Sequence, residues 1–166
     1  MKSCRILLAE DDETDAYLLR RAFHDAGEEV NLEVASDGQD AIERIERCVR
    51  SSTGRLPSLI VLDLKMPRRD GIGVLEWLRD QEVLRCIPTI LFSSSDREED
   101  TERAFAMGAN AYLVKPASVG DRNTVARFLA SYIRLNLPPA AAKIGYRSAL
   151  RAHKAYGLLL GEQTTG

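Results

Sequence analysis

Cysteine is rare in this sequence, and long apolar runs are absent from it. Three cysteines occur among 166 residues, Cys4, Cys48 and Cys86, and their wide spacing indicates neither a disulfide framework nor a paired-cysteine metal site. No stretch approaches the roughly 18 consecutive apolar residues that a membrane helix needs. The first apolar run, residues 6–9, stops at Glu10 and is too short for a signal peptide. We therefore expect a cytoplasmic protein with reduced cysteines.

Net charge is also small, but it is unevenly distributed. The 23 Lys and Arg residues against 25 Asp and Glu leave a formal charge of −2. Residues 1–133 carry 18 basic and 24 acidic side chains, whereas residues 134–166 carry 5 and 1. With 45% hydrophobic and 29% charged residues, the composition is that of a globular protein and excludes a wholly disordered or collagen-like chain. The length favours one domain.

Short apolar segments alternate with segments of helical periodicity, which is typical of a βαβ series around a parallel sheet. Residues 59–62 form the most apolar segment and indicate a central strand covered on both faces. Residues 30–35 alternate apolar and polar side chains, which indicates a strand nearer the sheet edge. We expect an α/β fold in which five helices accompany five strands, over residues 4–9, 30–35, 59–62, 89–92 and 111–114.

Several residues mark helix ends and faces. Asp12 is expected to cap the first helix and Gly27 to end it. Ser36 with Gln39 resembles a capping box that opens the second helix. The last predicted helix, over residues 119–135, has an expected inner face of Val125, Phe128, Leu129 and Ile133.

Residues 136–166 have a different character from the rest of the chain. Pro138 and Pro139 interrupt the chain, and the glycines beyond them weaken a partly helical pattern. We expect a C-terminal extension and no DNA-binding output domain, because the segment is short and weakly basic without an aromatic platform. A solvated terminal helix and a surface that packs in a homodimer or against a partner both remain open.

Polar residues follow the predicted strands directly. In an open parallel α/β sheet, ligands bind beyond the carboxyl ends of the strands. Carboxylates that converge there would repel one another unless a hard cation lay between them, and all-oxygen ligation suits Mg²⁺. The residues at these strand ends are Glu10, Asp11, Asp12, Asp63, Ser93 and Lys115.

Such a set fits phosphoryl transfer. A lysine and a hydroxyl beside the metal would stabilise the oxygens of a phosphoryl group during transfer. One carboxylate must then act as the nucleophile and form an acyl phosphate. Asp63 is favoured because it follows the most apolar strand.

The order of these residues resembles the receiver domain of two-component response regulators. Ser93 follows Asp63 by 30 positions and Lys115 follows it by 52, which is the spacing of that family. The resemblance covers residues 2–135 and implies a flavodoxin-like, doubly wound (βα)5 fold with a central five-stranded parallel sheet. The motifs that carry it are Glu10-Asp11-Asp12, Asp63 in Leu-Asp-Leu-Lys-Met-Pro, Asp70-Gly71, Ser93 and Lys115-Pro116.

The resemblance implies a Mg²⁺ site and a phosphoacceptor. Asp63 would be both the phosphoacceptor and a metal ligand. Asp11 would bind Mg²⁺ directly, Glu10 mainly through a water molecule, and Lys65 through its backbone carbonyl.

The resemblance also implies a switch. Lys115 would pair with the phosphoryl group, while Ser93 would sense a phosphoryl oxygen. Tyr112 matches the aromatic residue whose rotamer reports phosphorylation. Lys115-Pro116 would be a cis peptide, a geometry nearly confined to X-Pro bonds.

Two classes of function follow. The first is a signalling module that accepts phosphate from a sensor histidine kinase or a phosphotransfer protein and acts through protein–protein contacts. Within this class, the sequence resembles the single-domain regulators that accompany phytochrome-type sensor kinases. The second is a Mg²⁺ phosphatase that uses an aspartyl phosphate. Such phosphatases usually carry an acid two residues after the nucleophile, where this chain has Lys65, so we expect signalling rather than an enzyme.

Overall fold

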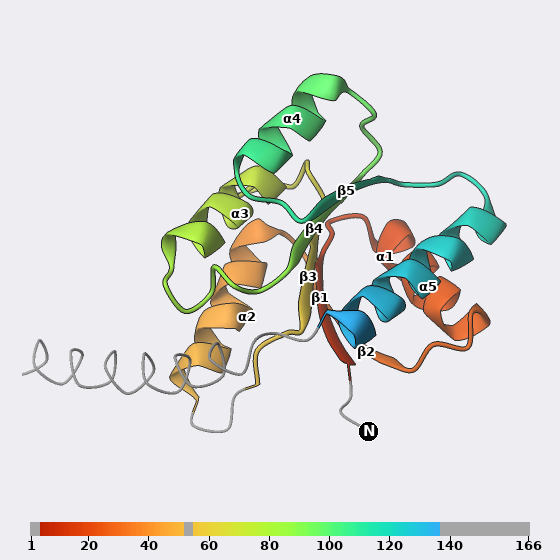
Figure 1. The fold of residues 1–166 in the computed structure, drawn as a ribbon, viewed down its shortest axis with the longest axis horizontal. Coiled ribbons are helices and arrows are strands. Elements are labelled where there is room, and N and C mark those ends of the chain that lie inside the picture. Colours follow the sequence, from red (N-terminus) through yellow and green to blue (C-terminus); the bar gives the residue numbers. More distant parts are fainter. Residues whose placement is uncertain (1–3, 52–54, 137–166) are drawn as a thin grey trace, which may run out of the picture.

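The computed structural model describes residues 4–51 and 55–136, and over these residues strands and helices alternate (Figure 1). The strands are β1 (Cys4–Ala9), β2 (Val30–Ala35), β3 (Leu59–Leu62), β4 (Thr89–Ser93) and β5 (Ala111–Val114). The helices are α1 (Glu13–Asp25), α2 (Gly38–Arg50), α3 (Gly71–Asp80), α4 (Glu98–Ala106) and α5 (Val119–Leu135).

The strands form one parallel sheet in the order β2-β1-β3-β4-β5. Every residue of β3 is buried, as its apolar sequence predicts for a central strand, and β2 lies at an edge. Ala9 pairs with Leu62, and Leu62 pairs with Leu91. The residues that follow these strands therefore meet at one edge of the sheet.

Two apolar layers cover the sheet, one on each face. Figure 1 shows α1 and α5 on one side and α2, α3 and α4 on the other. Along β1, the side chain of Leu7 joins the layer of α2 and α3, whereas Ile6 and Leu8 join the layer of α1 and α5. This alternation follows from the two-residue period of a strand, and it buries β1 on both faces.

The helix caps agree with the sequence signals in part. Asp12 caps α1 by accepting hydrogen bonds from the backbone N–H of Thr14 at 2.7 Å and of Asp15 at 3.2 Å, as expected. The expected capping box of Ser36 and Gln39 is wrong, because α2 begins one residue later. Its N-cap is Asp37, whose carboxylate accepts a hydrogen bond from the N–H of Asp40 at 2.9 Å.

The expected inner face of α5 is wrong at Phe128, which is 42% exposed. Leu129 is buried as expected, and its buried companions are the small residues Ala126 and Ala130. Phe128 lies instead beside Tyr132, with the two ring centroids 6.0 Å apart. Small side chains in the buried face let α5 pack closely on α1.

The expected C-terminal extension over residues 136–166 lies outside the described residues, apart from Asn136.

Two further expectations concern residues that the structure describes. Cys48 is half-buried and Cys86 exposed, and neither forms a disulfide. In the part of the chain that the structure describes, no helix has the length and apolar character that crossing a membrane requires.

Candidate functional site

The carboxyl edge of the sheet gathers polar side chains that are buried. Glu10 is 3% exposed, Asp63 7% and Ser93 2%. Backbone hydrogen bonds fix the two acids, because the N–H of Glu10 donates to the Ala35 carbonyl at 3.0 Å and that of Asp63 to the Ala9 carbonyl at 2.9 Å. Burial of two acids at one place is costly without a compensating charge.

Glu10, Asp11 and Asp63 each offer a carboxylate oxygen, and these oxygens all lie within 4.8 Å of one another. Glu10 and Asp63 are buried, whereas Asp11 is exposed to solvent. Three carboxylates at this separation repel one another, and oxygen ligands of this kind suit a hard divalent cation. The donor set therefore fits Mg²⁺.

Lys115 supplies a positive charge at the same place. Its Nζ lies 2.6 Å from Glu10 Oε2, 2.8 Å from Asp15 Oδ2 and 3.5 Å from Asp63 Oδ1. The backbone N–H of Lys115 donates to the carbonyl of Ser93 at 2.8 Å, which fixes where the side chain leaves β5. The ammonium group therefore bridges the ends of β1 and β3 and the first turn of α1.

Asp15 is a residue of this site that the sequence did not reveal. It lies three positions after Asp12, the N-cap of α1, and could equally be an acid that favours the helix N-terminus. Its position 100 residues before Lys115 gives no local signal of the pairing. Only the tertiary fold, in which the Lys115 side chain reaches from the end of β5 to the first turn of α1, brings the two together.

The ionisation of these groups reflects burial and mutual charge. Burial raises the pKa of Glu10 to about 7, although Lys115 opposes the shift. Burial also raises the pKa of Asp63, again against the effect of Lys115. For Lys115, burial lowers the pKa, but the hydrogen bonds to Asp15 and Glu10 outweigh it and the pKa lies above its usual value. Lys115 is therefore charged at neutral pH.

Ser93 and Tyr112 are linked through Ser95, in the segment between β4 and α4. The Oγ of Ser93 accepts a hydrogen bond from the N–H of Ser95 at 3.2 Å. The hydroxyl of Tyr112 donates to the carbonyl of Ser95 at 2.9 Å. Ser95 in turn donates through its own hydroxyl to Asp100 of α4 at 2.6 Å. A change at Ser93 therefore has a route of direct contacts to β5 and α4.

Lys65 lies in the segment between β3 and α3, and its side chain is exposed. A cavity of about 490 Å³ lies beside this segment, lined in part by Asp11, Lys65 and Asp70. The far end of the segment returns to Asp63, because Gly71 lies so close to the carbonyl of Asp63 that a Cβ atom would overlap it.

The expected cis peptide at Lys115-Pro116 is wrong. All peptide bonds within the described ranges are trans, including this one. The two isomers of an X-Pro bond differ by only about 0.5–1 kcal/mol in an unfolded chain, so the dipeptide sequence alone could not decide between them.

The fold and the site together identify the class of protein. The chain belongs to the response regulator receiver domain family, whose sequence pattern matches residues 6–126. It is 34% identical over 139 residues to the probable methanogenesis regulatory protein FilR2 of Methanothrix harundinacea, with 82% of this chain and 88% of that protein covered. It spans 52% of the length of another relative, the transcriptional regulatory protein PdtaR of Mycobacterium tuberculosis.

Solved structures of response regulators have the same fold. The response regulator RPA3017 in red light signaling of R. palustris is 34% identical, with a TM-score of 0.70 and with 77% of this chain and 92% of that one covered. The Mn(2+)-bound form of the response regulator Rcp1, a protein of Synechocystis, is 26% identical, with a TM-score of 0.71 and coverage of 82% and 99%. The chain is therefore a receiver-domain response regulator related to Rcp1.

Proposed function

We propose that this response regulator accepts a phosphoryl group on Asp63 in a Mg²⁺-dependent reaction and passes the change to a partner protein. The observation that carries the proposal is the meeting of Lys115 with Glu10 and Asp63, which form a carboxylate cluster with Asp11 at the carboxyl edge of the sheet. A buried acid beside a lysine and a metal-binding set is the arrangement that aspartyl phosphate formation needs.

Glu10, Asp11 and Asp63, with the backbone carbonyl of Lys65, would hold the Mg²⁺ ion. When bound, Mg²⁺ supplies the positive charge that neutralises both the carboxylates and the phosphoryl oxygens. The Mn(2+)-bound form of Rcp1 supports a divalent cation in a protein of this kind. Burial raises the pKa of Glu10 to about 7, so this side chain is only partly ionised at neutral pH, and a bound cation would favour its charged form.

In the transfer step, an oxygen of Asp63 forms a bond to phosphorus while the P–N bond of a phosphohistidine on the donor breaks. The imidazole leaves with the bonding electron pair and takes up a proton from solvent. Lys115, 3.5 Å from Asp63 Oδ1, would pair with one phosphoryl oxygen, and the hydroxyl of Ser93 would donate to another. Both residues act by position and charge.

Phosphorylation would then shift the population of two arrangements of the β4–α4 segment. Ser93 now accepts a hydrogen bond from Ser95, and a turn of its hydroxyl toward the phosphoryl group would weaken that bond. Tyr112 holds the carbonyl of the same Ser95 and would follow it. The surface formed by α4 and β5 would carry the change to the partner.

We propose a sensor histidine kinase of the phytochrome type as the phosphate donor. The support is the similarity to RPA3017, described as acting in red light signaling, and to Rcp1. Lys65 stands where related phosphatases carry an acid, which favours a signalling role over turnover of phosphate esters. Phosphoryl transfer from a phytochrome-type kinase should outpace transfer from an unrelated kinase, and equal rates would contradict this donor.

The phosphorylation itself is tested with acetyl phosphate and Mg²⁺. Intact-mass measurement should show one added phosphoryl group on the wild-type chain and none on Asp63→Asn. The fluorescence of Trp77, which packs partly buried against the core, should change in the wild type alone. An unchanged mass and fluorescence, equal to those of Asp63→Asn, would overturn the proposal.

We further propose that residues 2–135 form the receiver unit and that residues 136–166 are an extension to it. A chain ending at Asn136 should therefore keep metal-dependent phosphorylation, because all the site residues precede that point. Sedimentation of both forms then tests a role of the extension in forming a homodimer. Equal self-association of the two forms would remove that role, and loss of phosphorylation in the shorter form would contradict the domain division.

A further inference from the structure

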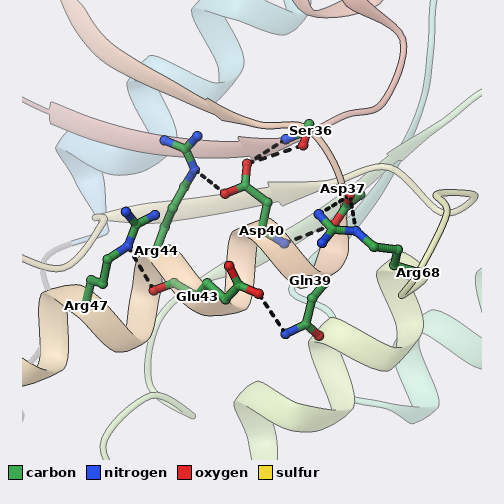
Figure 2. Close-up of polar contacts among 8 residues, drawn as sticks. All are labelled: Ser36, Asp37, Gln39, Asp40, Glu43, Arg44, Arg47 and Arg68. Atoms are coloured by element: carbon green, nitrogen blue, oxygen red, sulfur yellow. Dashed lines mark hydrogen bonds and ion pairs between the residues drawn. The ribbon is translucent and has the colours of Figure 1, made fainter.

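An ion pair joins the segment after the phosphoacceptor to the start of α2. In this pair, the guanidinium of Arg68 holds the carboxylate of Asp37, with Nε 2.7 Å and Nη2 2.5 Å from Oδ2 (Figure 2). The other oxygen of Asp37 accepts the capping hydrogen bond from the N–H of Asp40 at 2.9 Å. Asp37 is 5% exposed, whereas the side chain of Arg68 is 55% exposed. Both oxygens of a buried acid are therefore engaged.

The backbone of Arg68 is held in an unusual conformation. It has a φ of 60° and is the sole non-glycine residue with a positive φ in the described parts of the chain. The N–H of Arg69 donates to the carbonyl of Pro67 at 2.6 Å, which closes a tight three-residue turn around Arg68. Such a conformation costs free energy and persists when surrounding contacts determine it. Here the Asp37 carboxylate is the contact that holds the side chain of this residue.

The same turn lies against α2 through its backbone. Gly38 sits so close to the carbonyl of Arg69 that a Cβ atom would overlap it. At the other end of the segment, Gly71 approaches the carbonyl of Asp63 equally closely, and its N–H donates to the carbonyl of Leu64 at 3.0 Å. The segment from Asp63 to Gly71 is thus held at both ends and, through Arg68, in its middle.

From these contacts we infer that the Asp37–Arg68 pair positions the segment that carries Asp63 and the Lys65 carbonyl for binding a divalent cation. The inference rests on the proposed function, since it assigns positioning residues to that site. Arg68 and Asp37 touch neither the carboxylate cluster nor Lys115 in any contact described above. They act by fixing the path of the backbone between Asp63 and Asp70.

The chain offers variants that separate this role from general stability. Arg68→Gly removes the guanidinium but introduces the residue that best tolerates a positive φ. Asp37→Asn removes the charge and keeps an oxygen able to cap α2. Arg44→Gln is the matched control, because it breaks the Asp40–Arg44 ion pair of 2.9 Å one turn further along the same helix without touching the segment (Figure 2).

The experiment measures Mn²⁺ dissociation constants by calorimetry on the full chain, with thermal unfolding midpoints recorded beside them. Arg68→Gly and Asp37→Asn should each weaken Mn²⁺ binding about tenfold, as loss of a supporting contact around a metal site does. The double variant should bind no more weakly than either single one, since each change breaks the same pair. Arg44→Gln should bind as the wild type does, and the thermal midpoints should show that every variant is folded at the temperature of the binding measurement.

Wild-type Mn²⁺ affinity in folded Arg68→Gly would overturn the inference, and so would an equal loss of affinity in Arg44→Gln. Phosphorylation of Asp63 by acetyl phosphate, measured on the same samples, keeps the two questions apart. If the wild-type chain binds Mn²⁺ but takes up no phosphate, the proposed function fails while the comparison of Mn²⁺ affinities still decides the inference.

Discussion

The Nζ of Lys115 lies 2.8 Å from Asp15 Oδ2 but 3.5 Å from Asp63 Oδ1, so the lysine pairs more closely with Asp15 of α1 than with Asp63. Asp15 belongs to the first turn of α1, and its side chain is 35% exposed. A phosphoryl group on Asp63 would have to draw Lys115 from this neighbour. Asp15 would therefore compete with that phosphoryl group for the lysine.

Asp15→Asn should increase the fraction of protein phosphorylated at a fixed, limiting concentration of acetyl phosphate. Removing the competing charge leaves Lys115 more available to the phosphoryl group, with an effect of about 1 kcal/mol or less for a partly exposed pair. Glu13→Gln is the control, since it removes another acid from the same turn of α1. A phosphorylated fraction equal to that of the wild type, or lower, would count against the competition.

The stability of the metal-free protein should fall as pH rises through about 7. Burial raises the pKa of Glu10 to about 7 in the folded chain, above its usual value of 4.5, so between these values the folded state binds the extra proton. The contribution of Glu10 to stability is therefore favourable at low pH and is lost as the carboxylate ionises. Urea unfolding in EDTA between pH 5 and 8 measures this contribution as the difference in the free energy of unfolding between the wild type and Glu10→Gln.

Glu10→Gln should flatten this pH dependence, and at pH 8 it should be the more stable protein in EDTA. Addition of Mg²⁺ should stabilise the wild type more at pH 8 than at pH 5, because ligands bind metal in their ionised form. An identical slope for the two proteins in EDTA would show that the ionisation of Glu10 does not govern the effect.

Gly71→Ala should displace the backbone at Asp63, the proposed phosphoacceptor, because the added Cβ atom would overlap the carbonyl of Asp63. We expect a loss of stability of about 1–3 kcal/mol, typical of overpacking in a close contact, together with slower phosphorylation. Gly120→Ala is the matched control, since nothing lies within 4 Å of a Cβ atom there and the residue is in a helix. Chemical unfolding gives the free energy of unfolding of both variants, and equal values for the two would contradict the prediction.

Arg79→Lys should destabilise the fold by about 0.5–1.5 kcal/mol, because an ammonium group cannot replace the set of hydrogen bonds that the guanidinium donates. The guanidinium of Arg79 joins α3 to the turn after α4, with Nε 3.0 Å and Nη2 2.9 Å from the Gly108 carbonyl. Its Nη1 also donates to the Ile87 carbonyl at 3.3 Å. Exposed Arg85→Lys is the control in urea unfolding, and a loss no larger than that of the control would contradict this role.

The sequence predicted most of the fold, because strand and helix periodicities are local properties of the chain. The β3 segment 59–62 was recognisable as central because it has no polar residue, and its end predicted that Asp63 lies at the carboxyl edge of the sheet. Asp12 was a correct cap, but the cap of α2 was placed one residue early at Ser36. Neighbouring Ser and Asp side chains can both cap a helix, so the choice between them depends on the backbone path before it.

The candidate site was predictable in its members and not in its contacts. Glu10, Asp11 and Asp63 could be grouped because the carboxyl ends of neighbouring parallel strands share one edge. Asp15 could not be added to them, because its contact with Lys115 joins residues 100 positions apart and depends on where the tertiary fold places α1 relative to the end of β5.

By itself, the sequence determined the order of strands and helices along the chain and the acids, hydroxyl and lysine at the strand ends. Each of these follows from periodicity and from the position of a residue relative to its own strand. The tertiary structure alone decided that Lys115 pairs with Asp15, that Arg68 pairs with Asp37, and that Phe128 lies outside the core. These contacts join residues far apart in the chain or depend on how a helix rotates on the sheet, which no local pattern specifies.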